Sequence, residues 1–171
     1  MPNVIRFAAS PLAPFVGRWM RDPLSVSRNK VVKRMLGADG LQKLWACDSI
    51  QDRTECLASD PPLAEKYEAL LRLGGPASES CLEVTLQTLT FNDAASASSP
   101  AKSSRYQVAK VTAEGKKVVV ECVGLEIERQ GRRIGYVLRM NKNWLLVSER
   151  YYGPQAQIFP RSLVFRYDRP S

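Results

Sequence analysis

The sequence predicts an α+β fold in which N-terminal helices pack on a curved antiparallel sheet of five or six strands. Between Ser25 and Leu73 the apolar residues recur every three to four positions, which is typical of helices that bury one face. From Glu79 onward they alternate with polar residues, and β-branched and aromatic residues become more frequent, as in strands. Short connections with turn residues separate these later segments, which indicates hairpins.

Three helices are expected in the first half of the chain. Ser27 is a candidate N-cap for a helix that ends at Gly37, and Asp39 is a candidate start for a second helix that runs through Trp45. The third helix lies in "SDPPLAEKYEALLRLGG", where Asp60 is the expected N-cap, two prolines occupy the first turn and glycines follow the last apolar residue.

Six strands are expected in the second half, and their connections predict antiparallel pairing. The turns "AEGKK", "RQGR" and "NKN" are short and carry residues that favour tight reversals. Apolar residues occur on both faces of two strands, so the sheet needs two covers. The helices are a candidate cover for one face. The other face requires a partner protein, a curling of the sheet or the C-terminal segment. The expected strands are 81–91, 105–112, 117–129, 132–141, 143–152 and 162–167.

We divide the chain into a basic N-terminal arm at 1–24, an α+β domain at 25–152 and a C-terminal extension at 153–171. The first 34 residues carry seven basic side chains and one acidic one, a composition typical of a mitochondrial or plastid targeting segment, which we expect to be retained. The net charge of +8 is uneven, because an acidic middle block separates two basic ends. Removal of residues 1–24 is expected to leave the domain folded.

Composition argues against several kinds of catalytic site. The chain has no histidine, so catalytic pairs and metal sites that need an imidazole are excluded. Its four cysteines show no C-x-x-C spacing and are expected to be reduced. Phosphate-binding glycine loops are also missing. We therefore predict a protein that is not an enzyme, with no catalytic, cofactor-binding or metal-binding residues.

The segment 55–152 resembles the nuclear-transport-factor-like superfamily of cystatin-like α+β cones. The resemblance rests on a helix ending in "YEALLRLGG", a strand carrying "KKVVVECVGLEIERQGRR" and a final pair containing Trp144. For isomerases of that superfamily it implies an acidic base, Glu121 or Glu126, beside Tyr136 as a donor. A second resemblance is to the hotdog thioesterase fold, although its long central helix and His-Gly-Gly signature are missing.

The predicted function is that of a non-catalytic accessory subunit of a large mitochondrial inner-membrane complex, either a respiratory complex or ATP synthase. It would act through protein contacts, located in the matrix or peripherally on the membrane, with lipid contact through the arm. Alternatives are a mitochondrial ribosomal protein that contacts rRNA and a small-molecule-binding or isomerase-type protein. Arginines interleaved with aromatic residues favour a protein interface over RNA. The predicted partner-binding residues are Phe7, Phe15, Arg18, Trp19, Arg21, Arg129, Arg132, Arg133, Phe159, Arg161, Phe165, Arg166 and Tyr167.

Overall fold

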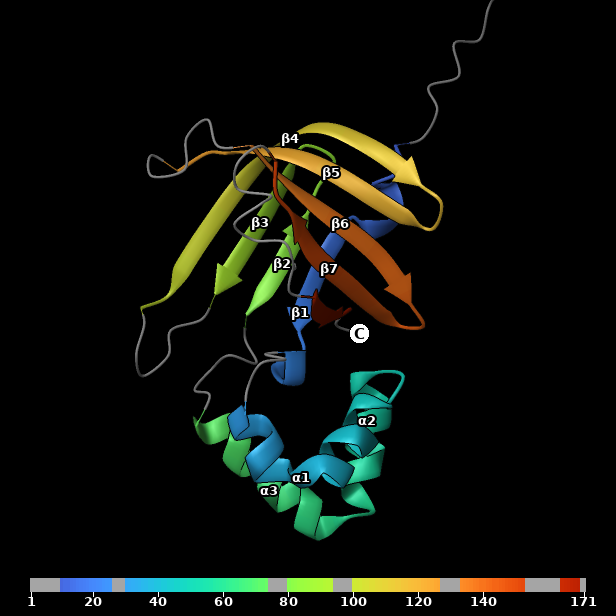
Figure 1. The fold of residues 1–171 in the computed structure, drawn as a ribbon, viewed down its shortest axis with the longest axis vertical. Helices are drawn as coiled ribbons and strands as arrows, with labels where there is room; N and C mark the ends of the chain where they lie inside the picture. The colour runs from blue at the N-terminus through green and yellow to red at the C-terminus, as the bar shows by residue number, and fades with distance from the viewer. Residues whose placement is uncertain are drawn as a thin grey trace, which may run out of the picture.

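The described part of the chain forms a closed antiparallel β-barrel with a layer of helices beneath it (Figure 1). The computed structural model describes residues 10–25, 30–73, 80–93, 100–126, 133–152 and 164–169. Each strand pairs with the next, and β8 pairs with β1 to close the barrel. The strands are β1 (Gly17–Arg21), β2 (Cys81–Val84), β3 (Thr88–Asp93), β4 (Lys102–Glu114), β5 (Lys117–Gly124), β6 (Arg133–Asn141), β7 (Trp144–Arg150) and β8 (Val164–Asp168).

The predicted curved sheet of five or six strands is wrong. The expected strand 81–91 is two strands, β2 and β3, joined at Thr85, whose hydroxyl oxygen accepts hydrogen bonds from the backbone N–H groups of Gln87 and Thr88. A further strand, β1, was assigned to the arm. The two-sided apolar pattern is satisfied by curling, because the sheet closes on itself and encloses one of its faces.

The two tight turns that the structure describes are confirmed. Gly115 joins β4 to β5 with φ 63°, and Lys142 joins β6 to β7 with φ 56°. Glycine adopts such a left-handed conformation without a steric cost, whereas Lys142 is a non-glycine residue in that region. The third predicted turn, at Gly131, lies outside the described residues.

The helical layer is inserted between β1 and β2 and lies outside the barrel (Figure 1). Its helices are α1 (Lys30–Trp45), α2 (Ile50–Ala58) and α3 (Pro61–Leu73), and 3-10 turns η1 (Ala13–Phe15) and η2 (Pro23–Ser25) flank β1. The backbone of Gly37 is non-helical inside α1, as the predicted helix end at this residue implied. The hydroxyl of Ser49 caps α2 and the carboxylate of Asp60 caps α3, so the expected Asp60 cap is confirmed.

Two apolar cores result from this arrangement. The helices bury their own cluster, which includes Leu36, Leu44 and Leu63. Inside the barrel, Leu12 and Phe15 join the strand residues, and the indole N–H of Trp19 donates to the Phe15 carbonyl at 2.8 Å. These side chains close the end of the barrel at which β1 begins.

The barrel includes residues from both predicted terminal segments. Strand β1 lies within the predicted arm at 1–24, and β8 lies within the predicted extension at 153–171. Gly17–Met20 pair with Val84–Cys81, and Met20 and Arg21 pair with Asp168 and Tyr167. In the described part of the chain, no helix is long and apolar enough to span a bilayer.

Candidate functional site

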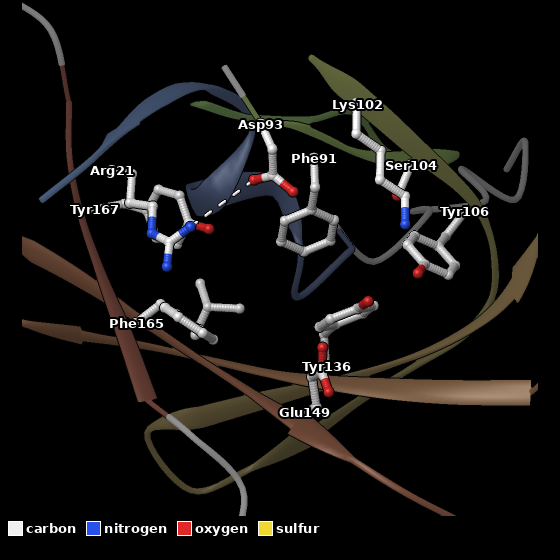
Figure 2. A pocket seen from close by; sticks show the side chains of 11 residues that line it. Arg21, Phe91, Asp93, Lys102, Ser104, Tyr106, Tyr136, Glu149, Phe165 and Tyr167 are labelled. Atoms are coloured by element: carbon white, nitrogen blue, oxygen red, sulfur yellow. Dashed lines mark ion pairs between the residues drawn. The ribbon is translucent and has the colours of Figure 1, made fainter. Parts of the chain in front are cut away.

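A cavity of about 190 Å³ lies inside the barrel, toward the end at which β1, β3 and β7 finish (Figure 2). Alternation along the strands explains its lining. Arg21 follows Trp19 by two positions, Asp93 follows Phe91, and Glu149 follows Val147, so each charged residue shares the inward face with an apolar one. The lining residues are Arg21, Phe91, Asp93, Lys102, Ser104, Tyr106, Tyr136, Val147, Glu149, Phe165 and Tyr167.

Aromatic rings form most of the cavity wall. The ring centroid of Tyr136 lies 4.8 Å from that of Phe91 and 5.4 Å from that of Tyr106. Figure 2 shows Phe91 and Tyr136 facing each other, with Phe165 and Tyr167 on the side of Arg21. Such tilted and edge contacts are the favoured arrangements of aromatic pairs.

Two phenols of this wall, those of Tyr136 and Tyr167, are neutral hydrogen-bonding groups at physiological pH. Burial, together with hydrogen bonding to Tyr106, raises the pKa of Tyr136. Burial also raises the pKa of Tyr167 to about 12. The phenols of Tyr136 and Tyr167 therefore keep their protons at pH 7 and present O–H donors.

Arg21 is the partly buried cation of the cavity. Its side chain is 21% exposed, and its guanidinium lies 4.5 Å from the centroid of the Phe165 ring. A long ion pair of 3.8 Å joins its Nη1 to Asp93, whose side chain is 53% exposed. The Nε atom of Arg21 is buried and has no hydrogen-bond partner. Arg21 therefore retains donor capacity inside the cavity.

The other charged groups of the cavity are already engaged or exposed. The hydroxyl of Tyr151 donates a hydrogen bond to the Glu149 carboxylate. Lys102, at the start of β4, is exposed. Charges of both signs, from Arg21, Asp93, Lys102 and Glu149, thus lie beside the aromatic wall.

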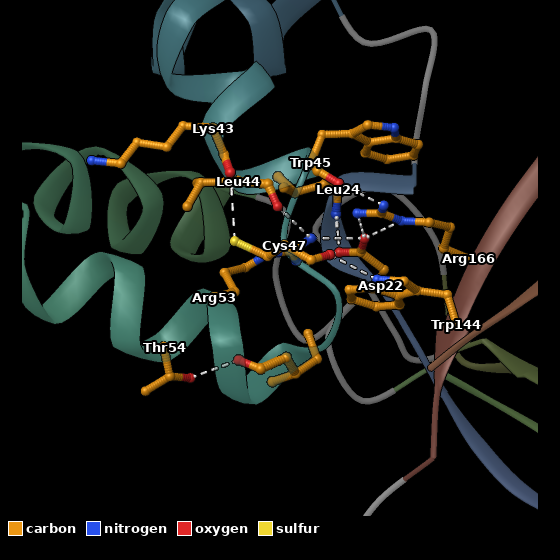
Figure 3. Close-up of polar contacts among 11 residues, drawn as sticks. Asp22, Leu24, Lys43, Leu44, Trp45, Cys47, Arg53, Thr54, Trp144 and Arg166 are labelled. Atoms are coloured by element: carbon orange, nitrogen blue, oxygen red, sulfur yellow. Dashed lines mark hydrogen bonds and ion pairs between the residues drawn. The ribbon is translucent and has the colours of Figure 1, made fainter. Parts of the chain in front are cut away.

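A second cluster of charges lies on the outer face of the barrel and attaches the helical layer (Figure 3). The Asp22 carboxylate is fully buried and accepts hydrogen bonds from Arg53 of α2 and Arg166 of β8, at 3.0 and 2.7 Å. The Arg166 guanidinium lies between two indoles, 3.5 Å from the ring centroid of Trp45 and 4.2 Å from that of Trp144. The Asp22 contacts connect the end of β1 to α2 and β8, and the indoles add contacts to α1 and β7.

This cluster also fixes the strand that carries Arg21. The backbone N–H of Asp22 donates to the Arg166 carbonyl at 2.8 Å, and its carboxylate accepts from the N–H of Leu24. Burial alone would raise the pKa of Asp22, but hydrogen bonding to Arg53 and the charges of Arg53 and Arg166 hold this pKa below its ordinary value. The carboxylate therefore stays ionised at neutral pH.

A wider cleft of about 980 Å³ separates the helices from the barrel. Apolar side chains such as Met20, Ile50 and Leu71 line it together with the charged Asp168 and Arg169. Burial raises the pKa of Asp168, although the backbone N–H groups of Arg169 and Ile50 oppose this effect. Arg169 also covers the Trp19 ring, at 4.3 Å from its centroid.

The predicted partner-binding residues are distributed over several environments. Phe15, Trp19 and Tyr167 are at most 5% exposed and pack in the barrel core. Arg18 and Arg133 are exposed, and Arg133 forms an ion pair with Glu121. The partner-binding role of the set stays a prediction. Arg21 and Phe165 line the cavity, Arg166 lies in the Asp22 cluster, and Phe7, Arg129, Arg132, Phe159 and Arg161 lie outside the described residues.

The isomerase-type residues do not meet in one pocket. Tyr136 points into the barrel, whereas Glu121 lies between the inward-facing Val120 and Cys122 and pairs with Arg133 outside. The Glu126 carboxylate accepts the backbone N–H of Arg105 at 2.5 Å. Sequence reasoning missed Phe91, Asp93, Lys102 and Glu149 as site residues. A charged residue at an otherwise apolar, inward position is the signal that could have found Asp93 and Glu149.

Comparison with protein-family models, curated proteins and solved structures finds no match for this chain. Membership of either superfamily that the sequence resembles stays a prediction. Among the described residues, no group of three or more acidic or cysteine side chains is placed to hold a metal ion. The four cysteines are free thiols, as the sequence predicted.

Proposed function

We propose that this protein binds a small organic molecule inside its barrel. The observation that carries the proposal is the interior cavity, with its aromatic wall and its partly buried arginine. An eight-stranded barrel is just wide enough to be filled by its own side chains or to hold one small ligand. Here the end closed by Leu12 and Phe15 is filled, whereas the opposite end contains the cavity.

The chemistry of the lining supports a binding role over a purely structural one. Burying a charged or polar group costs free energy unless it is paired, and apolar side chains would fill this space without that cost. Arg21 instead points inward with an unpartnered Nε. A few polar groups placed among aromatic ones are characteristic of small-molecule sites.

The size of the cavity limits the ligand. Drug-sized ligands occupy pockets of about 300–1,000 Å³, whereas a dry cavity of about 150 Å³ holds benzene. The cavity of about 190 Å³ therefore fits a single ring with a short substituent. The proposed function requires no catalytic step, and that the protein is not an enzyme stays a prediction.

The experiment is a binding screen with four one-ring probes: benzyl alcohol, benzamide, benzoate and benzylamine. Saturation-transfer NMR on the full chain would detect binding, and contacts from a bound probe to the Val147 methyls would locate it. Val147 is 2% exposed and lines the cavity, so Val147→Phe should lower the affinity of a bound probe by about tenfold or more.

The matched control is Val164→Phe, which makes the same change at an exposed position of β8. It should leave the affinity unchanged, and thermal melts would show that both variants fold. If Val147→Phe does not fold, NMR contacts from a bound probe to the Val147 methyls of the unaltered protein would show whether the probe lies in the cavity. The proposal is overturned if no probe binds at millimolar concentration, or if bound probes contact residues outside the cavity.

A further inference from the structure

We infer that the ligand of this cavity carries a carboxylate next to its ring and that Arg21 is the residue that binds the carboxylate. This inference rests on the proposed function, because it names the chemical class of the molecule in the same cavity. The juxtaposition that carries it is a partly buried guanidinium, with a buried and unpartnered Nε, beside an aromatic wall.

The first argument is the state of the Arg21 guanidinium. A guanidinium has five N–H donors in a planar fork, which matches the two oxygens of a carboxylate. The only ion pair that the described residues give Arg21 is the one with Asp93, at 3.8 Å, and Nε has no partner. A ligand carboxylate would supply acceptors for donors that the protein leaves unused.

The second argument is that Asp93 competes weakly. Its side chain is 53% exposed, and ion pairs with an exposed partner contribute little because water screens them. Arg21 is the more buried member of this pair. A bound carboxylate that excludes water would therefore interact with Arg21 more strongly than Asp93 does.

The third argument is the orientation that the cavity imposes. The Arg21 guanidinium is stacked over the Phe165 ring, which holds its plane in place. Phe91 and Tyr136 lie across the space from Arg21 and Tyr167 in Figure 2. A planar ring between these walls would direct a short acidic substituent toward Arg21, and the protonated phenol of Tyr167 lies on the same side as a further donor.

A positively charged ligand, such as an amine, is less consistent with the site. An amine would have to bind Glu149 or Asp93, the two acidic groups of the lining. Glu149 already accepts the Tyr151 hydroxyl, and Asp93 is exposed to water. An amine would also lie near Arg21 and Lys102, which would repel it.

The test compares benzoate, benzamide and benzylamine, which differ in charge but share the ring and similar size. Titrations followed by NMR on the full chain should show benzoate binding about tenfold or more tightly than benzamide. Arg21→Gln should remove this preference while benzamide still binds. Arg18→Gln is the matched control, because it makes the same change on the exposed face of β1.

A second variant keeps the inference testable if Arg21→Gln does not fold. Asp93→Asn removes the competing carboxylate at an exposed position, so it should raise the ratio of benzoate affinity to benzamide affinity severalfold. Equal binding of benzoate and benzamide, or preferential binding of benzylamine, would overturn the inference while the proposed function stands. Failure of every probe to bind would overturn the proposed function itself.

Discussion

Asp22 is the residue on which the attachment of helices to barrel depends most. Its carboxylate is fully buried between two arginines, and removing one member of a buried ion pair leaves uncompensated charge. Asp22→Asn should therefore lower the free energy of unfolding by about 3–5 kcal/mol, measured by urea denaturation. Asp48→Asn, at an exposed pair with Lys142, is the control and should cost about 0–1 kcal/mol. A cost for Asp22→Asn as small as that of the control would contradict this role.

The same residue predicts a pH dependence with a definite sign. The pKa of Asp22 in the folded state lies below its ordinary value, because hydrogen bonding to Arg53 and the charges of both arginines outweigh burial. The stabilisation is therefore complete above the unfolded-state pKa of about 4 and is lost as the pH falls through the folded-state pKa. The stability difference between the unaltered protein and Asp22→Asn should shrink below about pH 4. A difference that stays constant in acid would show that the charge of Asp22 is not the cause.

At the scale of the element, the turn between β2 and β3 depends on a threonine. The Thr85 hydroxyl oxygen accepts hydrogen bonds from the N–H groups of Gln87 and Thr88, at 3.2 and 2.9 Å. Thr85→Val keeps the side-chain shape but removes these acceptors, so it should cost about 1 kcal/mol of unfolding free energy. Thr85→Ser retains the hydroxyl and should behave like the unaltered protein. Urea denaturation measures both, and equal stability of the two variants would refute the role of the hydroxyl.

This turn also explains which elements could be predicted from the sequence. The Gly115 and Lys142 turns and the Asp60 cap were predictable, because glycine, asparagine and aspartate act locally on the backbone. Thr85 also acts locally, but threonine is a frequent strand residue, so 81–91 read as one strand. The pattern alone does not reveal that a hydroxyl replaces the usual glycine or proline.

Closure of the barrel was not predictable from local pattern at all. Strand β1 is five residues long and contains two arginines, so the segment resembled a basic arm. One of these, Arg21, points inward because the cavity has room for it. The pairing of Met20 and Arg21 with Asp168 and Tyr167 joins opposite ends of the chain, and no short window of sequence contains that information.

At the scale of the whole molecule, the candidate site also depends on closure of the barrel. Its residues come from β1, β3, β4, β6, β7 and β8, and only the register of the closed barrel brings them together. Arg21 and Phe165 were singled out from sequence as members of a partner surface. In the structure both residues line the cavity, and the Arg21 guanidinium lies over the Phe165 ring.

The whole-molecule prediction concerns the first 24 residues, whose removal is expected from the sequence alone to leave the domain folded. The structure predicts the opposite outcome, because this segment contains η1 and β1. Its removal would delete Leu12, Phe15 and Trp19 from the barrel core and leave β2 and β8 as unpaired edges. Loss of one large buried side chain costs about 3–5 kcal/mol, and a typical domain has about 5–15 kcal/mol in total.

The truncated chain should therefore show no cooperative thermal transition by circular dichroism, and it should lose probe binding because the cavity is no longer enclosed. Adding a synthetic peptide of residues 10–25 should restore part of both signals, since the peptide contains η1 and all of β1. Arg18→Gln in the full chain is the control, because it alters an exposed residue of the same strand and should melt normally. A cooperative melt of the truncated chain would show that β1 is dispensable and that the remaining strands close or cover the core without it.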